Sequence, residues 1–325
     1  MLWFYVLIFI FCCVLLYFSG EWVIRGLMKI ARILGWREFI VAFFIMAFAA
    51  SLPNLLVGIF SALDGTPELS FGDVAGNNLV AITLAVALGV IFAKRKEISA
   101  DCQTIQTTSI FTAVAAVLPI LLILDGDLSR IDGILLICFF VFYVCWLFSK
   151  EERFSKIYND YKFAGAKKIK IFLVELARVV LGIVFLLGAA KGIVESAQFF
   201  AEKFDLSIAL IGVFVVGLGN ALPETYFSVI SARRGEASMI LGNLMGSVIV
   251  PATLVLGVVA LICPIQITNF SLFLSARIFL VIASFFFFFF VKTGEKITKN
   301  EAIILLAIYI SFLLSEIFIQ RVILK

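Results

Sequence analysis

The segments Ser51-Leu52-Pro53-Asn54 and Ala221-Leu222-Pro223-Glu224, which lie 170 residues apart, decide how this sequence is interpreted. Each one places a proline inside an otherwise apolar stretch, with oxygen-bearing side chains beside it. At the same spacing, Ser61-Ala62 recurs as Ser231-Ala232. A self-similarity of this kind predicts that the chain consists of two related halves.

The composition around these segments indicates a protein that is embedded in lipid. Of the 325 residues, 63% are hydrophobic and 15% are charged, and the mean hydropathy is +1.15. Soluble domains are about 45–50% apolar and about 25% charged, so a soluble enzyme, a disordered chain and a nucleic-acid-binding protein are excluded. The absence of histidine and of any CxxC pair also excludes zinc sites and histidine-based catalysis. We therefore expect an integral membrane protein that is not an enzyme and has no cofactor.

Ten apolar stretches are long enough to cross a hydrocarbon layer of about 30 Å. They lie near residues 2–19, 39–63, 72–93, 108–124, 132–149, 171–190, 207–232, 238–263, 270–291 and 301–319. The first has no basic n-region and no small-residue cleavage site, which indicates a membrane helix and not a signal peptide. The run Phe285–Phe290 is expected to face lipid, and Glu175 and Glu316 are expected at the membrane interface. The predicted fold class is an all-α membrane protein.

Basic residues concentrate in alternate loops, which predicts the orientation of the chain. Of the 26 lysines and arginines, 19 follow the odd-numbered spans. The positive-inside rule places these loops in the cytoplasm and both termini outside, in a cell (inner) membrane. We expect a first five-helix repeat over residues 1–149, a short basic cytoplasmic loop over 150–170, and a second five-helix repeat over 171–325.

The charges of equivalent loops change sign between the halves. After the Ser-Ala pair the first half carries Asp64, whereas the second carries Arg233 and Arg234. Equivalent loops then lie on opposite sides of the membrane, which is the inverted-topology repeat of secondary transporters. The alternative is a tandem duplication retained only for packing, which would not require helix breaks at matched positions.

The matched prolines predict an ion site at the middle of the membrane. Proline removes a backbone hydrogen bond, and the carbonyl that it frees needs a partner at membrane depth. Hard cations prefer carboxylate, amide and hydroxyl oxygens. The candidate ion-binding residues, which lie near mid-span, are Glu224, Asn54, Ser51, Asn77, Asn220, Asn243 and Ser247. The expected helix-breaking residues are Pro53, Pro223, Gly76, Gly242 and Gly246.

Glu224 is expected to be the principal group of this cation site, because it is the one carboxylate placed deep in an apolar span. An acid within the membrane marks an ion or proton path by default. Asp73, at the start of the predicted third span, is a possible guard of the entrance or a helix-start acid favoured by the helix dipole.

These residues resemble the cation/calcium exchanger superfamily, which includes the sodium/calcium exchangers. In that family each of two inverted five-helix halves carries G-T-S-L-P-E and, on the next helix, G-N-x-x-G-S-x-x-x-N/D. The second half of this chain keeps the residues Pro223, Glu224, Gly242, Asn243, Gly246 and Ser247. It has Asn220 and Ala221 where the family has Thr and Ser, and Pro251 where the family has the closing Asn or Asp.

The first half departs further from the family pattern. Asn54 stands where the family has glutamate, and Ala50 stands where it has threonine. Gly76-Asn77 is matched to the Gly-Asn pair of the second motif, so Val80 and Ala81 replace its Gly-Ser pair and Ala85 replaces its closing Asn. In the family the two glutamates, with neighbouring polar residues, bind sodium and calcium alternately.

The resemblance implies a secondary active cation antiporter of the sodium/calcium exchanger type that works by alternating access. Its partners would be the lipid bilayer and inorganic cations (Na+, Ca2+ or H+), and a monomer is compatible with the sequence. Because Glu224 lacks a second carboxylate, a monovalent sodium/proton exchanger is an alternative. A transport-deficient family member that acts as a membrane binding or scaffold protein is the other.

Overall fold

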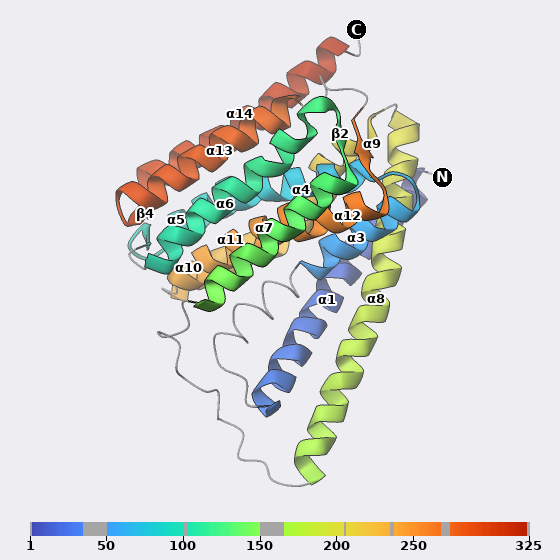
Figure 1. Cartoon of the computed structure of the whole chain (residues 1–325), viewed down its shortest axis with the longest axis vertical. Helices are drawn as coiled ribbons and strands as arrows, with labels where there is room; N and C mark the ends of the chain where they lie inside the picture. The colour runs from blue at the N-terminus through green and yellow to red at the C-terminus, as the bar shows by residue number, and fades with distance from the viewer. Residues whose placement is uncertain are drawn as a thin grey trace.

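A computed structural model describes residues 2–34, 51–100, 103–149, 166–204, 206–234, 237–267 and 274–323. These residues are predominantly helical (Figure 1). The α-helices are α1 (Leu2–Leu34), α3 (Leu52–Leu63), α4 (Glu68–Val80), α5 (Val86–Phe92), α6 (Gln103–Leu122), α7 (Arg130–Ser149), α8 (Ala166–Phe204), α9 (Ile208–Ile211), α10 (Leu218–Arg234), α11 (Ala237–Val250), α12 (Leu256–Ile262), α13 (Leu274–Thr293) and α14 (Lys299–Ile323).

Eight helical segments among the described residues are long and apolar enough to cross a membrane. They are Leu2–Leu27, Glu68–Phe92, Gln103–Asp125, Arg130–Ser149, Lys170–Phe204, Gly212–Arg233, Ile240–Ile262 and Leu274–Thr293. The predicted second span is described only from residue 51, where it contains α3. The predicted last span lies within α14. Large apolar side chains are exposed on these helices, as lipid-facing surfaces require.

Two continuous helical rods share the same irregular middle. In the first rod a π-helical turn, η2 (Ala81–Ala85), joins α4 to α5, and in the second η6 (Pro251–Val255) joins α11 to α12. Each element of the second rod after its first helix begins 170 residues after its counterpart. Thr83 donates a hydrogen bond to the carbonyl of Leu79, four residues earlier, and the matching Thr253 does the same. This competition for backbone acceptors is a cause of helix distortion that both rods share.

Two short sheets connect the halves of the chain. β1 (Glu97–Ser99), which follows α5, pairs antiparallel with β4 (Lys296–Thr298), which lies between α13 and α14. β2 (Asp127–Leu128), after the 3-10 turn η3 (Ile123–Asp125), pairs antiparallel with β3 (Ile265–Gln266), which follows α12. Each sheet therefore takes one strand from each half, and the two sheets lie at opposite ends of the bundle (Figure 1).

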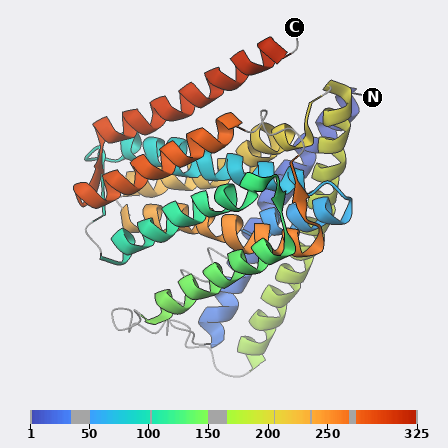
Figure 2. The same cartoon turned by 45° about the horizontal axis from the view of Figure 1, so that its top comes forward.

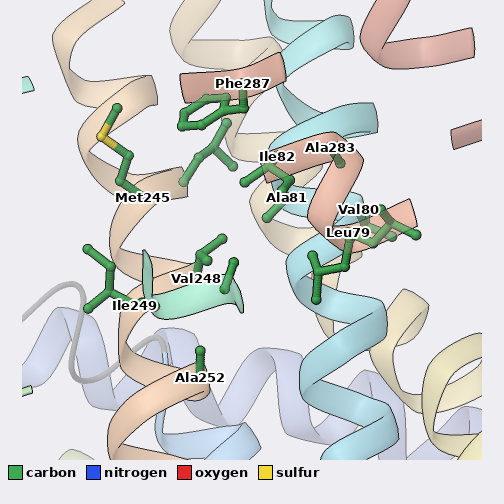
Figure 3. Close-up of a cluster of buried hydrophobic side chains, with 14 of the residues drawn as sticks. Leu79, Val80, Ala81, Ile82, Met245, Val248, Ile249, Ala252, Ala283 and Phe287 are labelled. Atoms are coloured by element: carbon green, nitrogen blue, oxygen red, sulfur yellow. The ribbon is translucent and has the colours of Figure 1, made fainter. Parts of the chain in front are cut away.

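The hydrophobic core lies where the two rods meet α13. Leu79, Val80, Ala81 and Ile82 from the first rod face Met245, Val248, Ile249 and Ala252 from the second, beside Ala283 and Phe287 (Figure 3). The sequence predicted that the whole phenylalanine run faces lipid, and this is wrong for part of the run. Phe287 is completely buried, whereas Phe285 is 60% exposed, because a helix turns successive side chains to different faces.

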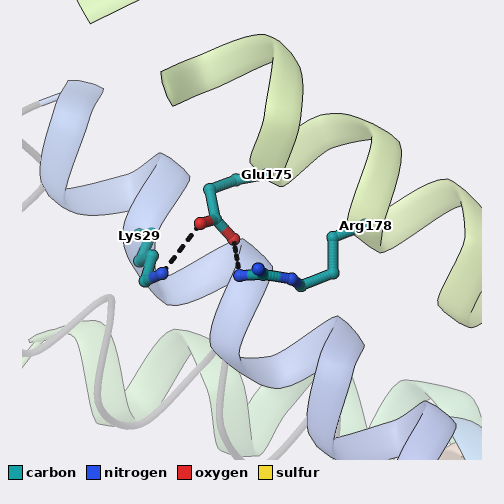
Figure 4. Close-up of polar contacts among 3 residues, drawn as sticks. All are labelled: Lys29, Glu175 and Arg178. Carbon is teal, nitrogen blue, oxygen red and sulfur yellow. Dashed lines mark hydrogen bonds and ion pairs between the residues drawn. The ribbon is translucent and has the colours of Figure 1, made fainter. Parts of the chain in front are cut away.

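α1 and α8 lie side by side and form a pair that crosses the other helices (Figures 1 and 2). Both are longer than the predicted spans, because their charged ends continue the helix beyond the apolar stretch. Close packing is possible because a Cβ at Gly182 would lie 2.7 Å from Val23 Cγ2. Glu175 on α8 forms two ion pairs (Figure 4). Its Oε1 lies 2.8 Å from Lys29 Nζ on α1, and its Oε2 lies 2.6 Å from Arg178 Nη1.

Candidate cation site

Four of the five residues predicted to break helices lie inside described helices, whereas Pro53 lies where α3 begins, and residues 35–50 are outside the described ranges. Pro53 is in the first turn of α3, where its missing N–H has no partner to lose, and Pro223 lies inside α10. Gly76 lies within α4, and Gly242 and Gly246 lie within α11. The departures from α-helical geometry are the π segments η2, η6 and η5 (Gly212–Gly217), which directly precedes α10. A π turn in a helix often accompanies a functional site.

Asp73 does not lie at an entrance. α4 begins at Glu68, before the predicted start of its span, so Asp73 is in the second turn and is completely buried. The side-chain amide of Asn220 on α10 donates a 2.8 Å hydrogen bond to Asp73 Oδ1. Asn220, a predicted ligand, is therefore hydrogen-bonded to a carboxylate that the sequence indicated only as a possible entrance residue.

Glycines allow α4 to approach η5 and α10 backbone to backbone. A Cβ added at Gly76 would lie 2.2 Å from the carbonyl oxygen of Val213. One added at Gly217 would lie 2.7 Å from the carbonyl oxygen of Asp73, and one at Gly212 would lie 2.5 Å from another carbonyl of α4. Small residues bring membrane helices this close in general. The role of Gly76 is therefore to permit contact, which sets the Asp73–Asn220 distance.

A polar stripe runs along the face of α4 that Asp73 occupies. Ser70, Asp73 and Asn77 are spaced by three and four residues, which places them on one helix face, and all three are completely buried. Asn77 Nδ2 donates a 3.1 Å hydrogen bond to the backbone carbonyl of Ser247 on α11. The stripe therefore joins the two rods; it includes one predicted ligand, Asn77, and contacts a second, Ser247.

Five buried oxygen atoms of this region have no hydrogen-bond donor among the described residues. They are Ser70 Oγ, Asp73 Oδ2, Asn77 Oδ1, Asn78 Oδ1 and Glu224 Oε2. A buried polar group without a partner costs about 1–3 kcal/mol, more if it is charged. Four of them are amide or carboxylate oxygens, which accept, and the Ser70 hydroxyl can accept as well, so a cation or water would satisfy them, whereas an anion or an apolar ligand would not.

Glu224 belongs to the same region. It lies one helical turn from Asn220, the hydrogen-bond donor to Asp73, on the same face of α10. Neither carboxylate forms an ion pair with a base in the part of the chain that the structure describes. That part also contains no group of three His, Cys, Asp or Glu residues able to hold a metal ion. The oxygens of this region that have no partner among the described residues thus come from two carboxylates, two amides and one hydroxyl.

The remaining predicted ligands lie on α3 and α11. Asn54 is buried, one turn from Gly58, whose added Cβ would lie 2.8 Å from Ser70 Oγ. Ser51 is also buried, at the start of α3. On α11, Ser247 is buried and donates to the carbonyl of Leu244, while Asn243 is half-buried one turn earlier.

The structure corrects the alignment of the two halves by one helical turn. The constant 170-residue spacing of the rods continues back into α4 and α11. It pairs these positions: Asp73 with Asn243, Gly76 with Gly246, and Asn77 with Ser247. Gly72-Asp73 is therefore the counterpart of the Gly-Asn pair, and Gly76-Asn77 is the counterpart of Gly-Ser. The same spacing of the proline segments is the signal in the sequence that would have revealed this register.

Known proteins resemble the chain over nearly its full length. Residues 4–149 and 174–318 match the sodium/calcium exchanger protein family. An uncharacterized membrane protein of Methanocaldococcus jannaschii is 29% identical over 93% of this chain and 94% of its own length. The sodium/calcium exchanger MaX1 of Methanosarcina acetivorans is 24% identical over 91% of this chain and 93% of its own.

Solved structures share the fold. The sodium-calcium exchanger NCX_Mj, soaked with Na+ and Sr2+, aligns with a TM-score of 0.65 at 26% identity, over 97% of this chain and 99% of that one. The same exchanger soaked with zero Na+ and Ca2+ aligns with a TM-score of 0.62 at 26% identity. Because the family match covers both halves, this integral membrane protein belongs to the sodium/calcium exchanger family.

Proposed function

We propose that this chain is a secondary active cation antiporter that exchanges sodium for calcium across the membrane by alternating access. The observation that carries the proposal is the group of five buried oxygens on α4 and α10 that have no hydrogen-bond partner among the described residues. Family membership and the likeness to NCX_Mj support the same activity.

Glu224 is the principal cation ligand in this proposal. A carboxylate within a membrane span and without a basic partner needs a bound cation or a proton to offset its charge. The other oxygens come from side chains on the helices around it, namely Ser51, Asn54, Asn77, Asn220, Asn243 and Ser247. Asn77 and Asn220 already contact neighbouring helices, so ion binding and helix packing involve the same residues.

The proposed architecture has ten spans in two inverted five-helix halves, 1–149 and 171–325, joined by the basic loop 150–170. The matched π turns of the two rods support the repeat. The sheets support its inversion. β1 follows the first rod and β3 follows the second, yet these two strands belong to sheets at opposite ends of the bundle. In this orientation both termini are outside, and the membrane is the cell (inner) membrane.

A monovalent exchanger, sodium for protons, is the second candidate. The observation that favours it is Asn54, a neutral residue at the position matched to Glu224. A transport-deficient scaffold is disfavoured, because such a protein has no use for buried acceptors that cost stability when they are empty.

The test is transport in proteoliposomes that contain the purified protein. Radioactive calcium uptake driven by an outward sodium gradient is compared with sodium uptake driven by a pH gradient. Sodium-dependent calcium uptake is expected, and it should be lost in Glu224→Gln. Glu195→Gln is the matched control, because Glu195 is an exposed acid on α8. If wild-type protein moves neither ion, or if Glu224→Gln transports normally, the proposal fails.

A further inference from the structure

We infer that Asp73 is a second cation ligand and supplies the negative charge that the first half lacks at Asn54, so that the site accepts a divalent cation. This inference rests on the proposed transport function and deepens it. It assigns a role to a residue on α4 whose counterpart in the second half, Asn243, is neutral.

Charge balance is the first part of the argument. Glu224 alone leaves a dehydrated divalent cation with one uncompensated positive charge, and in a low-dielectric interior that charge is strongly unfavourable. Asn54 adds no charge. Asp73 accepts a hydrogen bond from Asn220, which lies one turn from Glu224 on the same face of α10, so the two carboxylates lie in one region and together match a charge of +2.

Geometry is the second part. Asn220 holds Asp73 Oδ1 at 2.8 Å, which fixes the carboxylate and leaves Oδ2 without a donor among the described residues. Ser70 Oγ and Asn77 Oδ1, which flank Asp73 on the same face of α4, are likewise without donors and completely buried. Carboxylate, amide and hydroxyl oxygens on one rigid helix face make a set of hard-cation ligands, which a residue that serves only to join two helices would not need.

The competing interpretation is that Asp73 only joins α4 to α10 through Asn220. Asp73→Asn separates the two, because asparagine keeps the size of the side chain and an oxygen that accepts from Asn220 but removes the charge. A structural role predicts unchanged ion binding. A ligand role predicts a selective loss of divalent affinity.

The experiment measures equilibrium Ca2+ binding and sodium-driven Ca2+ uptake for four proteins: wild type, Asp73→Asn, Asn54→Glu, and the double variant. Melting temperatures without ions confirm that each variant is folded. Asp73→Asn should weaken Ca2+ binding at least about tenfold, which corresponds to about 1.4 kcal/mol. The double variant, which moves the carboxylate from position 73 to position 54, should recover most of that loss. Asn54→Glu alone should bind Ca2+ more tightly than the wild type.

Each outcome distinguishes this inference from the proposed function. Wild-type Ca2+ affinity in folded Asp73→Asn overturns the role of Asp73 and leaves exchange through Glu224 intact. Sodium binding without any Ca2+ binding in the wild type overturns the divalent assignment. Ca2+ binding that depends on Asp73 in a protein without flux upholds the inference and refutes transport.

Discussion

Replacing Gly76 by alanine should inactivate the cation site, although the substitution changes none of the proposed ligand side chains. The new Cβ would lie 2.2 Å from the carbonyl oxygen of Val213, where ordinary contact begins at 3.4 Å. Because the clash is with backbone, α4 and η5 must separate by roughly 1 Å. The Asp73–Asn220 hydrogen bond, now 2.8 Å, would then exceed the distance at which such bonds are effective. We expect a loss of about 1–3 kcal/mol in unfolding free energy, as for other overpacked sites, and loss of calcium uptake.

Gly242→Ala is the matched control for this prediction. Gly242 lies within α11, and a Cβ there would meet no atom of the described residues within 4 Å. Alanine is a better helix former than glycine by about 1 kcal/mol, so this variant should be neutral or slightly stabilised. Thermal unfolding in detergent and flux in liposomes measure the two effects. Wild-type melting and wild-type uptake in Gly76→Ala would refute the reasoning that glycine contact sets the site geometry.

Three further predictions concern the site, the orientation and the α1–α8 pair. Glu224→Gln should abolish coupled flux. It should also raise the melting temperature of the ion-free protein, because folding then no longer has to desolvate the charge of a carboxylate. A lower melting temperature would contradict this. Single cysteines placed in 150–170 should react with membrane-impermeant reagents only from the cytoplasmic side, and those in 125–132 only from outside. The reverse pattern would refute the proposed orientation. Glu175→Gln should cost about 1 kcal/mol of unfolding free energy, because it weakens two ion pairs whose basic partners are partly exposed, and an unchanged denaturation midpoint would contradict that value.

Much of the helical layout follows from hydropathy, since apolar stretches of sufficient length leave few alternatives in lipid. The extent of α1 and α8 does not follow from it. Their charged ends, including Lys29, remain helical outside the apolar stretch, and hydropathy measures affinity for lipid and not helix continuity.

The site was only partly predictable, because its key contact is long-range. The sequence marks Asn220 and Asn77 as polar groups within apolar spans, and both lie in the polar region that the structure shows. Asp73 was misplaced because a span boundary in the sequence is uncertain by about a turn, and one turn decides whether an acid is at the rim or inside. Glu316 is 2% exposed and accepts a hydrogen bond from Ser275, while its position at the membrane interface stays a prediction.

The π turns were not predictable from proline and glycine alone. Pro251 begins η6, but its counterpart at the start of η2 is Ala81, so proline is not the shared cause. Thr83 and Thr253 form the same backbone bond in the two rods, but Thr112 forms it within the regular helix α6 and η5 contains no threonine, so this residue type does not by itself predict a π turn.

The two small sheets restrict which movements are available to this protein. β1–β4 joins the halves at one end of the bundle and β2–β3 joins them at the other, so a rocking of one half against the other would have to break strand pairing at both ends. Neither α1 nor α8 is joined to a sheet within the described residues, and the two helices contact each other more than they contact the rest of the protein. Alternate exposure of the site would therefore arise from a sliding of this pair across a frame that keeps its shape. A disulfide between β1 and β4 should leave such a transporter active, whereas one that joins α1 to α10 should arrest it.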